Sequence, residues 1–316
     1  MPLPSQVAFV FPGQGSQRVG MGVELLRDQP RLFDRYLSAA DRATGVQISR
    51  MCMEADQVAL TRTEVAQPAV FALSLALAEY AEVMGLRPHA MAGHSLGEYT
   101  AAVASGSLGL EDGMLIVAER GRLMAQAQAQ RPGSMIAVIG LDASDVAHIC
   151  VEASTRGTAV IGNLNTPSQV VVSGDDVAIE RVQELALLAG AEEVVRLAAG
   201  AAFHSPLMSS VRVQLTPLLE QSEWKDPRVP VVANTTGNAV RMGHEVKVAL
   251  AEQIDAPLLW TACIATLRAL GCSTFLEIGP GRVLTGLLRQ IDPDAQAFAA
   301  DSPAKVMRIA ASLADD

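Results

Sequence analysis

The chain has 316 residues, half of them hydrophobic, so it can bury a large core and is not intrinsically disordered. Its formal net charge of −10 excludes the overall basic face that nucleic-acid binding requires. The amino-terminal segment Met1–Gln6 lacks the pattern of a secretory signal, and no apolar run is long enough to span a bilayer. We therefore expect a cytoplasmic protein without a nucleic-acid or membrane partner.

In chain order, short apolar runs that end in turns alternate with helical patterns. The runs predict strands at Val7–Phe11, Ala90–Ala92, Val229–Ala233 and Thr274–Ile278. The longest helical pattern predicts a helix over Pro68–Met84. This alternation is typical of a parallel sheet with crossover helices, and such sheets bind ligands at the carboxyl ends of their strands.

Residues 130–198 follow a different order of elements. Strands are predicted at Met135–Ile139, Ala159–Gly162, Gln169–Val172 and Glu192–Leu197, with helices at Ser144–Glu152 and Asp175–Leu188. A turn is expected at Asn165–Pro167, between the second and third strands. This βαββαβ order predicts a small ferredoxin-like domain at 130–198. An α/β large domain would comprise 1–129 and 199–316, with hinges at Arg131–Gly133 and Ala198–Gly200.

A serine lies between two glycines in Gly93-His94-Ser95-Leu96-Gly97, where an extended run ends and a helical run begins. A strand, a turn and a helix in this order are typical of a nucleophile elbow. The turn exposes the serine hydroxyl, and the glycines avoid side-chain clashes. Ser95 is therefore the candidate nucleophile.

A serine hydroxyl needs a base to take its proton. His94 is adjacent to Ser95, but neighbours on a tight turn point apart. His204, in a loop after the predicted small domain, is the better candidate, although an isolated loop histidine is more often structural. No histidine lies near the carboxyl terminus, where α/β-hydrolases have theirs, and no orienting carboxylate is recognisable. Both absences weaken a hydrolase interpretation.

Five motifs follow one another along the chain, and one of them contains Ser95. The others are Phe9-Val10-Phe11-Pro12-Gly13-Gln14-Gly15-Ser16-Gln17, Glu119-Arg120-Gly121, Asn163-Leu164-Asn165-Thr166-Pro167 and Glu277-Ile278-Gly279-Pro280-Gly281. Together they resemble the malonyl-CoA:acyl carrier protein transacylases and the acyltransferase domains of polyketide synthases, from about Val7 to Leu287. That family combines a hydrolase-like large domain with a ferredoxin-like small domain.

The resemblance implies roles for the residues at matching positions. Ser95 would carry the acyl group, and His204 would act as base and then as acid. A backbone carbonyl oxygen near Gln253 would orient this histidine in place of a carboxylate. The backbone N–H groups of Gln14 and Leu96 would form the oxyanion hole.

The resemblance also implies how the acyl group is chosen. Arg120 would bind the free carboxylate of a malonyl group, because a planar guanidinium pairs well with a carboxylate. On the local pattern alone, Arg122 would be an equal candidate. Phe203 resembles the malonyl-selective branch of the family, since its ring would crowd the added methyl of a methylmalonyl group.

Amide side chains complete the expected substrate site. Asn165 and Gln253 are expected to border the substrate. Gln253 and Gln14 are the better candidates, and Asn165 ranks with Asn163 and Asn234 as secondary. No metal or other cofactor is expected, because the cysteines and histidines show no ligand spacing and the reaction needs none.

The resemblance implies an S-malonyltransferase. It would move a malonyl group from coenzyme A to the phosphopantetheine thiol of an acyl carrier protein, through a Ser95 ester in a ping-pong cycle. The alternatives are a carrier-protein proofreading hydrolase or thioesterase, transfer of another carboxyacyl unit such as methylmalonyl, and a noncatalytic docking module. Fatty-acid synthesis, polyketide or antibiotic biosynthesis and malonate decarboxylase loading would share these residues.

Acyl carrier proteins are usually acidic, so we expect a positive patch near the cleft to receive the partner. Lys225, Arg282 and Arg289 are candidate contributors. We expect the enzyme to be a monomer.

Overall fold

The computed structural model describes residues 6–198 and 201–314. The expectation for the amino-terminal segment therefore lies outside the described residues, apart from Gln6. Two positions of the second predicted hinge, Ala199 and Gly200, also lie outside them. Among the described residues, no helix is both long and apolar enough to cross a membrane.

The larger of two sheets has six strands in the order β10-β9-β1-β2-β7-β8. Their bounds are β1 Gln6–Phe11, β2 Ala90–Gly93, β7 Val231–Val232, β8 Ala239–Val240, β9 Cys272–Ile278 and β10 Gln296–Ala300. All neighbours are parallel except β7 and β8, which form a short antiparallel pair at the edge. The predicted parallel sheet is therefore mixed at one edge.

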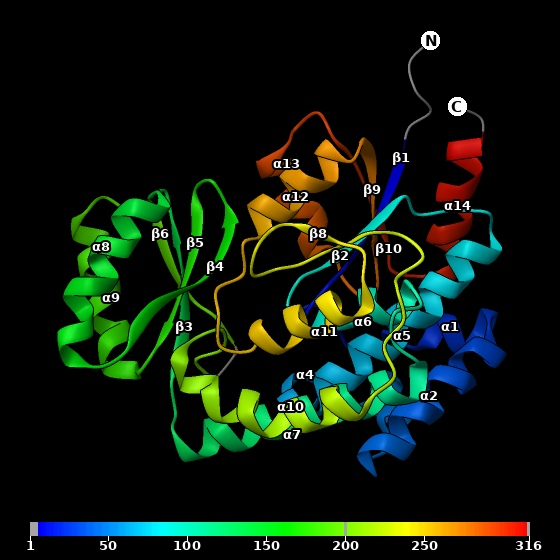
Figure 1. The fold of residues 1–316 in the computed structure, drawn as a ribbon, viewed down its shortest axis with the longest axis horizontal. Coiled ribbons are helices and arrows are strands. Elements are labelled where there is room, and N and C mark those ends of the chain that lie inside the picture. Colours follow the sequence, from blue (N-terminus) through cyan, green and yellow to red (C-terminus); the bar gives the residue numbers. More distant parts are fainter. Residues whose placement is uncertain (1–5, 199–200, 315–316) are drawn as a thin grey trace.

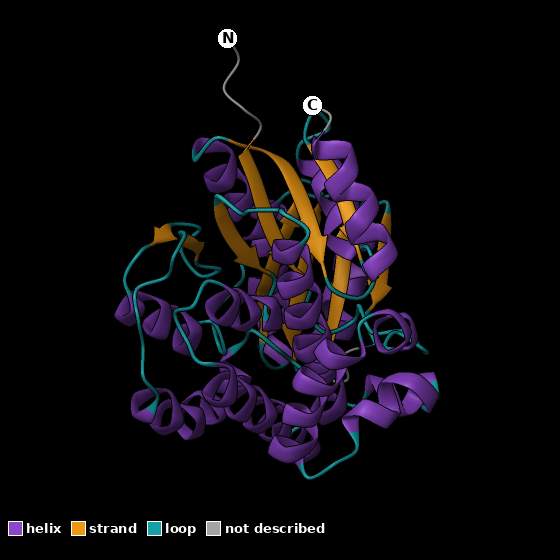
Figure 2. Ribbon diagram, turned by 90° about the vertical axis from the view of Figure 1, so that its right-hand side faces the viewer, coloured by secondary structure: helices purple, strands orange, loops and turns teal. Residues whose placement is uncertain are grey.

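The large sheet is buried on both faces, as parallel sheets are. Phe9 and Phe11 of β1 belong to one hydrophobic cluster, and the alternate residues Ala8 and Val10 belong to another. This period of two puts successive side chains on opposite faces. Figure 2 shows the strands side by side with helices around them.

The helices of the large domain precede and follow the small domain in the chain. Their bounds are α1 Val23–Asp28, α2 Pro30–Thr44, α3 Ile48–Glu54, α4 Gln57–Thr61, α5 Thr63–Val83, α6 Leu96–Ala104, α7 Leu110–Gln130, η2 Pro206–Met208, α10 Ser209–Gln221, α11 Gly243–Glu252, α12 Trp260–Ala269, α13 Val283–Ile291 and α14 Pro303–Ala314.

Helix α5 begins earlier than the sequence indicates. It starts at Thr63, five residues before Pro68, which therefore lies inside the helix. A proline removes one helical hydrogen bond, which is why the prediction began there. Val65, Ala66 and Gln67 in the added turn are almost fully buried. Tertiary burial of this turn thus outweighs the local preference.

The smaller sheet has four strands in the order β4-β5-β3-β6, all antiparallel. Its elements are β3 Ser134–Ile139, α8 Ala143–Ala153, η1 Ser154–Arg156, β4 Ala159–Thr166, β5 Gln169–Gly174, α9 Asp176–Leu188 and β6 Glu193–Arg196. The predicted βαββαβ order and ferredoxin-like fold class are confirmed. The limits of the two domains stay a prediction.

Strand β4 differs from the prediction and connects the domains. Asn165 and Thr166 lie inside β4 rather than in a turn, because β4 stays paired with β5 as far as Thr166 despite two register shifts. On its other side, β4 forms two backbone hydrogen bonds of 2.8 Å with Leu258 of the large domain. The Leu164 N–H donates to the Leu258 oxygen, and the Leu258 N–H donates to the Gly162 oxygen. Figure 1 shows the small domain beside the large one, with α7 leading into it.

Candidate active site

The segment from β2 to α6 forms a strained turn with Ser95 at its tip. Ser95 has φ of 54°, a left-handed conformation that is costly for a residue with a side chain. The two glycines of the motif are required by close packing. A Cβ at Gly93 would lie 1.8 Å from the carbonyl carbon of Gly97, and one at Gly97 would lie 2.0 Å from the Phe11 oxygen.

Asn234, which follows β7, holds this turn in place. Its Oδ1 accepts a hydrogen bond from the Ser95 N–H at 2.9 Å, and its Nδ2 donates to the Gly93 carbonyl oxygen at 2.7 Å. The side chain is fully buried. A single amide thus bonds the backbone on both sides of the turn and stabilises the conformation of Ser95.

Ser95 and His204 lie within hydrogen-bonding distance. Ser95 Oγ is 2.8 Å from His204 Nε2, and His204 Nδ1 is 2.8 Å from the Gln253 carbonyl oxygen. A carbonyl oxygen only accepts, so the Nδ1 atom carries the proton and Nε2 is free to accept one. Burial, then the nearby Arg120 charge, lower the pKa of His204 to about 3, so the ring is neutral at neutral pH.

The backbone N–H groups of Leu96 and Gln14 belong to segments that meet at this turn. Leu96 is the first residue of α6, where the N–H groups have no partner within the helix. Gln14 follows β1 in a loop that lies against the elbow, since a Cβ at Gly13 would be 2.6 Å from the His94 oxygen. A helix amino terminus is a favourable place for a developing oxyanion.

Arg120 of α7 reaches the same point from a neighbouring helix. Its Nη2 donates to Ser95 Oγ at 3.1 Å and to Gln253 Oε1 at 3.1 Å, and its Nη1 donates to Gln67 Oε1 at 2.7 Å. Only 1% of the residue is exposed. The guanidinium carbon lies 5.1 Å from the Tyr99 ring centroid.

The structure separates Arg120 from Arg122. Residues two apart on a helix point to different sides. Arg122 is exposed and forms an ion pair with Glu119, with Nη2 2.6 Å from Oε1. Only Arg120 therefore adjoins the serine.

Amide side chains link the site into one network. Gln253 Nε2 donates to the Ser95 carbonyl oxygen at 2.8 Å and to Glu98 Oε2 at 2.7 Å. On the other side of Arg120, Gln67 Nε2 donates to Gln14 Oε1 at 3.3 Å. Hydrogen bonds therefore extend without a break from Glu98 through Arg120 to Gln14.

Two predicted residues lie outside this network. The Asn165 Oδ1 atom is 2.9 Å from His94 Nε2, so this amide contacts the small-domain side of the elbow rather than Ser95. Phe203 is buried, and its carbonyl oxygen accepts a hydrogen bond from Ser173 of β5 at 2.6 Å. Their proposed contacts with a substrate stay predictions.

Glu98 and Gln67 were not among the predicted site residues, and Asn234 ranked only as a secondary candidate. Glu98 is 1% exposed and Gln67 is 1% exposed, which is rare for such polar residues unless they have partners. Gln67 was detectable as an amide at the start of a long apolar run. Glu98 was detectable as the carboxylate three residues after Ser95, on the first turn of a helix otherwise rich in small and apolar residues.

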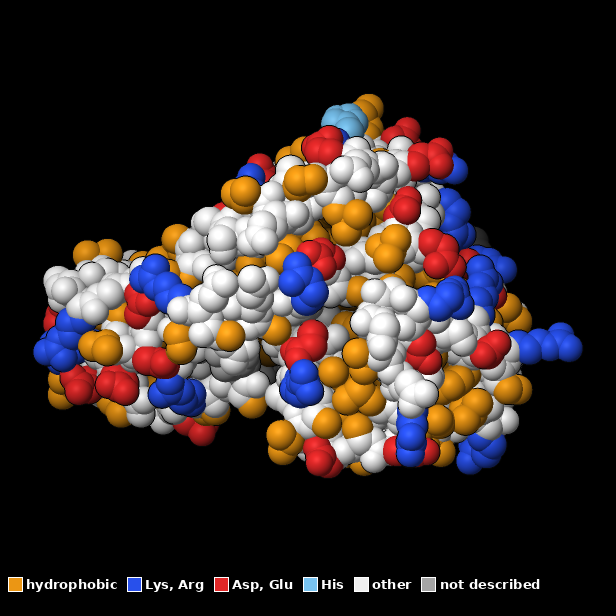
Figure 3. All heavy atoms as spheres, turned by 90° about the horizontal axis from the view of Figure 1, so that it is seen from below, with side chains coloured by type: hydrophobic (Ala, Val, Ile, Leu, Met, Phe, Trp, Pro, Cys, Tyr) orange, Lys and Arg blue, Asp and Glu red, His pale blue; other side chains and the backbone are white. Residues whose placement is uncertain are grey.

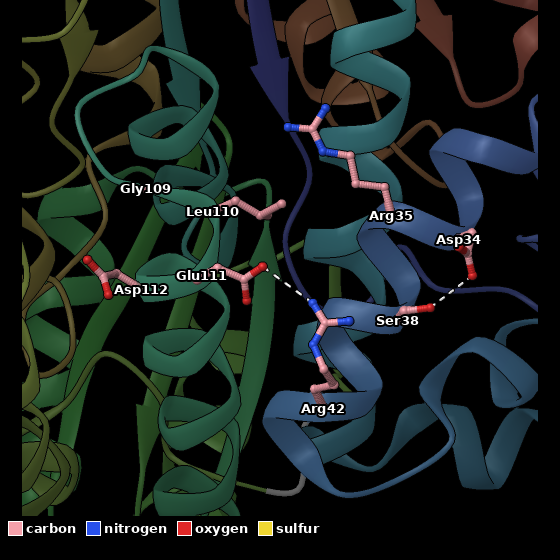
Figure 4. Close-up of a pocket in the computed structure, with 8 residues that line it drawn as sticks. All are labelled: Asp34, Arg35, Ser38, Arg42, Gly109, Leu110, Glu111 and Asp112. Atoms are coloured by element: carbon pink, nitrogen blue, oxygen red, sulfur yellow. Dashed lines mark hydrogen bonds and ion pairs between the residues drawn. The ribbon is translucent and has the colours of Figure 1, made fainter.

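A surface hollow of about 520 Å³ lies away from this site. It lies between α2 and the start of α7 and is lined largely by polar and charged side chains, with an Arg42–Glu111 ion pair across it (Figure 4). None of the predicted site residues lines it. From below, acidic and basic side chains are interspersed, and an indentation separates the two lobes at one edge (Figure 3).

Comparisons with known proteins identify the family of this chain. The sequence profile of the acyl transferase domain matches residues 8–313. The malonyl CoA-acyl carrier protein transacylase of Bacillus subtilis is 38% identical over 303 residues, which cover 95% of this chain and 94% of that protein.

Solved structures give the same result. The crystal structure of a malonyl-CoA:acyl carrier protein transacylase from Xanthomonas oryzae is 36% identical, with a TM-score of 0.93 and 98% of each chain covered. A malonyl-transacylase solved in complex with its type II polyketide-synthase acyl carrier protein is 33% identical, with a TM-score of 0.93 and coverage of 99% of this chain and 100% of that one. The chain therefore belongs to the acyl transferase family, among the malonyl-CoA:acyl carrier protein transacylases.

Proposed function

We propose that this protein transfers a malonyl group from coenzyme A to the phosphopantetheine thiol of an acyl carrier protein, through an ester on Ser95. One observation carries the proposal. Ser95 Oγ lies between a base and a buried cation, 2.8 Å from His204 Nε2 and 3.1 Å from Arg120 Nη2. A nucleophile beside a buried guanidinium suits an acyl group that brings its own carboxylate.

The first half of the cycle loads the enzyme. The Ser95 hydroxyl gives its proton to His204 Nε2 while Oγ attacks the thioester carbonyl carbon. The N–H groups of Gln14 and Leu96 would bind the resulting oxyanion. The carbon–sulfur bond then breaks, and His204 returns the proton to the departing coenzyme A sulfur.

The second half reverses these steps with a different thiol. The carrier-protein thiol gives its proton to His204 and attacks the Ser95 ester, and the proton then returns to Ser95 Oγ. The cycle uses side chains, backbone N–H groups and two thiols, so it calls for no cofactor. Atoms and charge balance in each half.

The substrate carboxylate would also improve the base. After burial, the positive charge of Arg120 is the next largest cause of the low pKa of His204. A malonyl carboxylate bound directly to Arg120 would offset that charge beside Ser95, whereas Glu98 lies beyond Gln253. The pKa of His204 would therefore rise, and proton transfer would become easier. An acetyl group has no such charge. Selection of the malonyl group would therefore operate on the rate as well as on binding.

Arg120 also argues against a proofreading hydrolase. A plain acyl chain has no carboxylate to bind a guanidinium that adjoins the nucleophile, 3.1 Å from Ser95 Oγ. Among carboxyacyl groups, we propose that Phe203 favours malonyl over methylmalonyl, since it directly precedes His204. The methyl group would change binding by roughly 1–3 kcal/mol.

We propose that the carrier protein docks against α13. Arg282, the residue directly before α13, and Arg289, in the last turn of that helix, are exposed and have no ion-pair partner among the residues that the structure describes. Helix α13 also packs against β4 of the small domain. Lys225 is a weaker candidate, because its Nζ is 3.5 Å from Glu223 Oε1. The monomeric state and the cytoplasmic location stay predictions.

Intact-mass spectrometry tests the proposed function. The protein is mixed briefly with malonyl-CoA, acetyl-CoA or methylmalonyl-CoA, and carrier protein is then added. We expect a malonyl adduct that is absent from Ser95→Ala and that moves to the carrier. Loss of the adduct to water at the same rate without carrier would establish the hydrolase instead. Absence of labelling by any acyl-CoA would reject both.

A further inference from the structure

The buried charge of Arg120 has only neutral hydrogen-bond partners. Its Nη atoms donate to Gln67, Gln253 and Ser95, and its Nε atom is buried without a partner among the described residues. An isolated buried cation is unfavourable, and proteins compensate such a charge with a nearby anion. The compensating group must therefore lie beyond these neutral side chains.

Glu98 of α6 is placed to supply that charge. Its Oε2 accepts from Gln253 Nε2 at 2.7 Å, and the same amide accepts from Arg120 Nη2 at 3.1 Å through Oε1. Its other oxygen accepts from the Asn234 backbone N–H at 3.3 Å. Glu98 is 1% exposed, so solvent screens its interaction with Arg120 only weakly. One amide thus separates a buried carboxylate from a buried guanidinium.

We propose that Glu98 is the counter-ion of Arg120 in the unloaded site, and that it takes up a proton when a malonyl carboxylate binds Arg120. Two carboxylates that share one buried cation cannot both ionise easily. The substrate carboxylate then takes the place of Glu98 as the anion, and the buried site keeps its balance of charge. This inference rests on the proposed malonyl transfer.

The charge environment of Glu98 fits such an exchange. Burial raises the pKa of Glu98 to about 7, against the opposing effects of Gln253, Asn234 and Arg120. The other titratable groups beside it are the Tyr99 phenol of α6 and the Cys263 thiol of α12, whose pKa values burial raises, so both stay neutral. The His204 ring lies across Gln253. Arg120 is therefore the charge whose neutralisation would shift the pKa of Glu98.

Proton uptake during loading tests this proposal. Stoichiometric enzyme and malonyl-CoA are mixed in weak buffer with an indicator dye, and the adduct is quantified by intact mass in the same sample. Transfer of the malonyl group from coenzyme A to the Ser95 hydroxyl itself consumes no proton, as long as the released coenzyme A thiol stays protonated. We expect uptake to approach one proton per adduct at about pH 8 and to fall toward zero at about pH 6, where Glu98 is already protonated.

Two variants identify the group that takes the proton. Glu98→Gln keeps the shape of the side chain and should load without this uptake, and it also supplies the background from thiol ionisation. Glu277→Gln is the matched control. Glu277 is likewise 1% exposed, but it accepts hydrogen bonds from Leu284 and Thr285 of α13 rather than from the site. Uptake should persist in this control.

The outcomes separate this inference from the proposed function. Absence of an adduct would reject malonyl transfer itself. An adduct without uptake, or uptake that persists in Glu98→Gln, would overturn the role of Glu98 and leave malonyl transfer standing. If Glu98→Gln fails to fold, infrared difference spectra of the native protein still decide. A buried protonated carboxyl band should appear on loading and should shift on H/D exchange, unlike the ester carbonyl band of the adduct, and its absence would overturn the proposal.

Discussion

Replacing Asn234 with alanine should disable the nucleophile turn without touching either reacting side chain. The substitution removes the hydrogen bonds at 2.9 Å to the Ser95 N–H and at 2.7 Å to the Gly93 oxygen. Asn234 is fully buried, so water does not readily replace them. Ser95, at φ of 54°, would then be free to relax toward an ordinary conformation.

The structure sets the expected size of the loss of stability and of the loss of acylation rate. Each buried backbone group left without a partner costs about 1–3 kcal/mol, and relaxation of the turn recovers part of this. We therefore expect the free energy of unfolding to fall by about 2–4 kcal/mol. A displacement of Ser95 Oγ by a fraction of its 2.8 Å separation from His204 should slow acylation by roughly 100-fold.

Urea unfolding and single-turnover acylation by malonyl-CoA measure these two effects. Asn238→Ala is the matched control, because Asn238 is exposed in the same turn between β7 and β8. It should change the free energy of unfolding by less than about 0.5 kcal/mol. Acylation of Asn234→Ala at the native rate would refute the view that this amide holds the nucleophile.

Arg120→Ala should slow acylation by malonyl-CoA roughly 10²–10³-fold more than acylation by acetyl-CoA, since only the malonyl group loses a charged partner. Single-turnover mass spectrometry gives the ratio, and equal losses would contradict substrate recognition by Arg120. The difference in unfolding free energy between Glu98→Gln and the native protein should move by about 2 kcal/mol in favour of the variant when the pH rises from about 5.5 to about 8. The pKa of Glu98, about 7 when folded, exceeds its ordinary 4.5, so the native fold loses stability as this carboxyl ionises, and urea unfolding at both pH values checks the sign. Arg282→Ala and Arg289→Ala should raise KM for the carrier protein several-fold more than KM for malonyl-CoA, and should weaken the salt dependence of transfer, whereas Arg308→Ala on α14 should not. Unchanged carrier kinetics would place the docking surface elsewhere.

Local patterns predicted the order of the elements well, and their ends less well. The small domain follows the predicted βαββαβ order, because period-two and helical patterns are properties of short segments. The start of α5 and the end of β4 were wrong, since burial around Gln67 and bonds from β4 to Leu258 extend these elements. Those contacts come from residues distant in the chain.

The nucleophile turn and the family follow from the amino-acid sequence alone. Gly93, Ser95 and Gly97 are close neighbours, and a tight turn between a strand and a helix can be inferred from such neighbours. The resemblance of the motifs to those of known acyltransferases then indicated His204 and Arg120.

The surroundings of these residues depend on the folded chain. Asn234 lies 139 positions from Ser95, and Gln253 lies 155 positions from Glu98, so no local pattern relates them. The sheet order brings the ends of β1, β2 and β7 together, α6 packs against β1 and β2, and α7 packs against α6. Burial then obliges each polar group to find a partner, and for that reason the network of Glu98, Gln253 and Arg120 exists only in the tertiary structure.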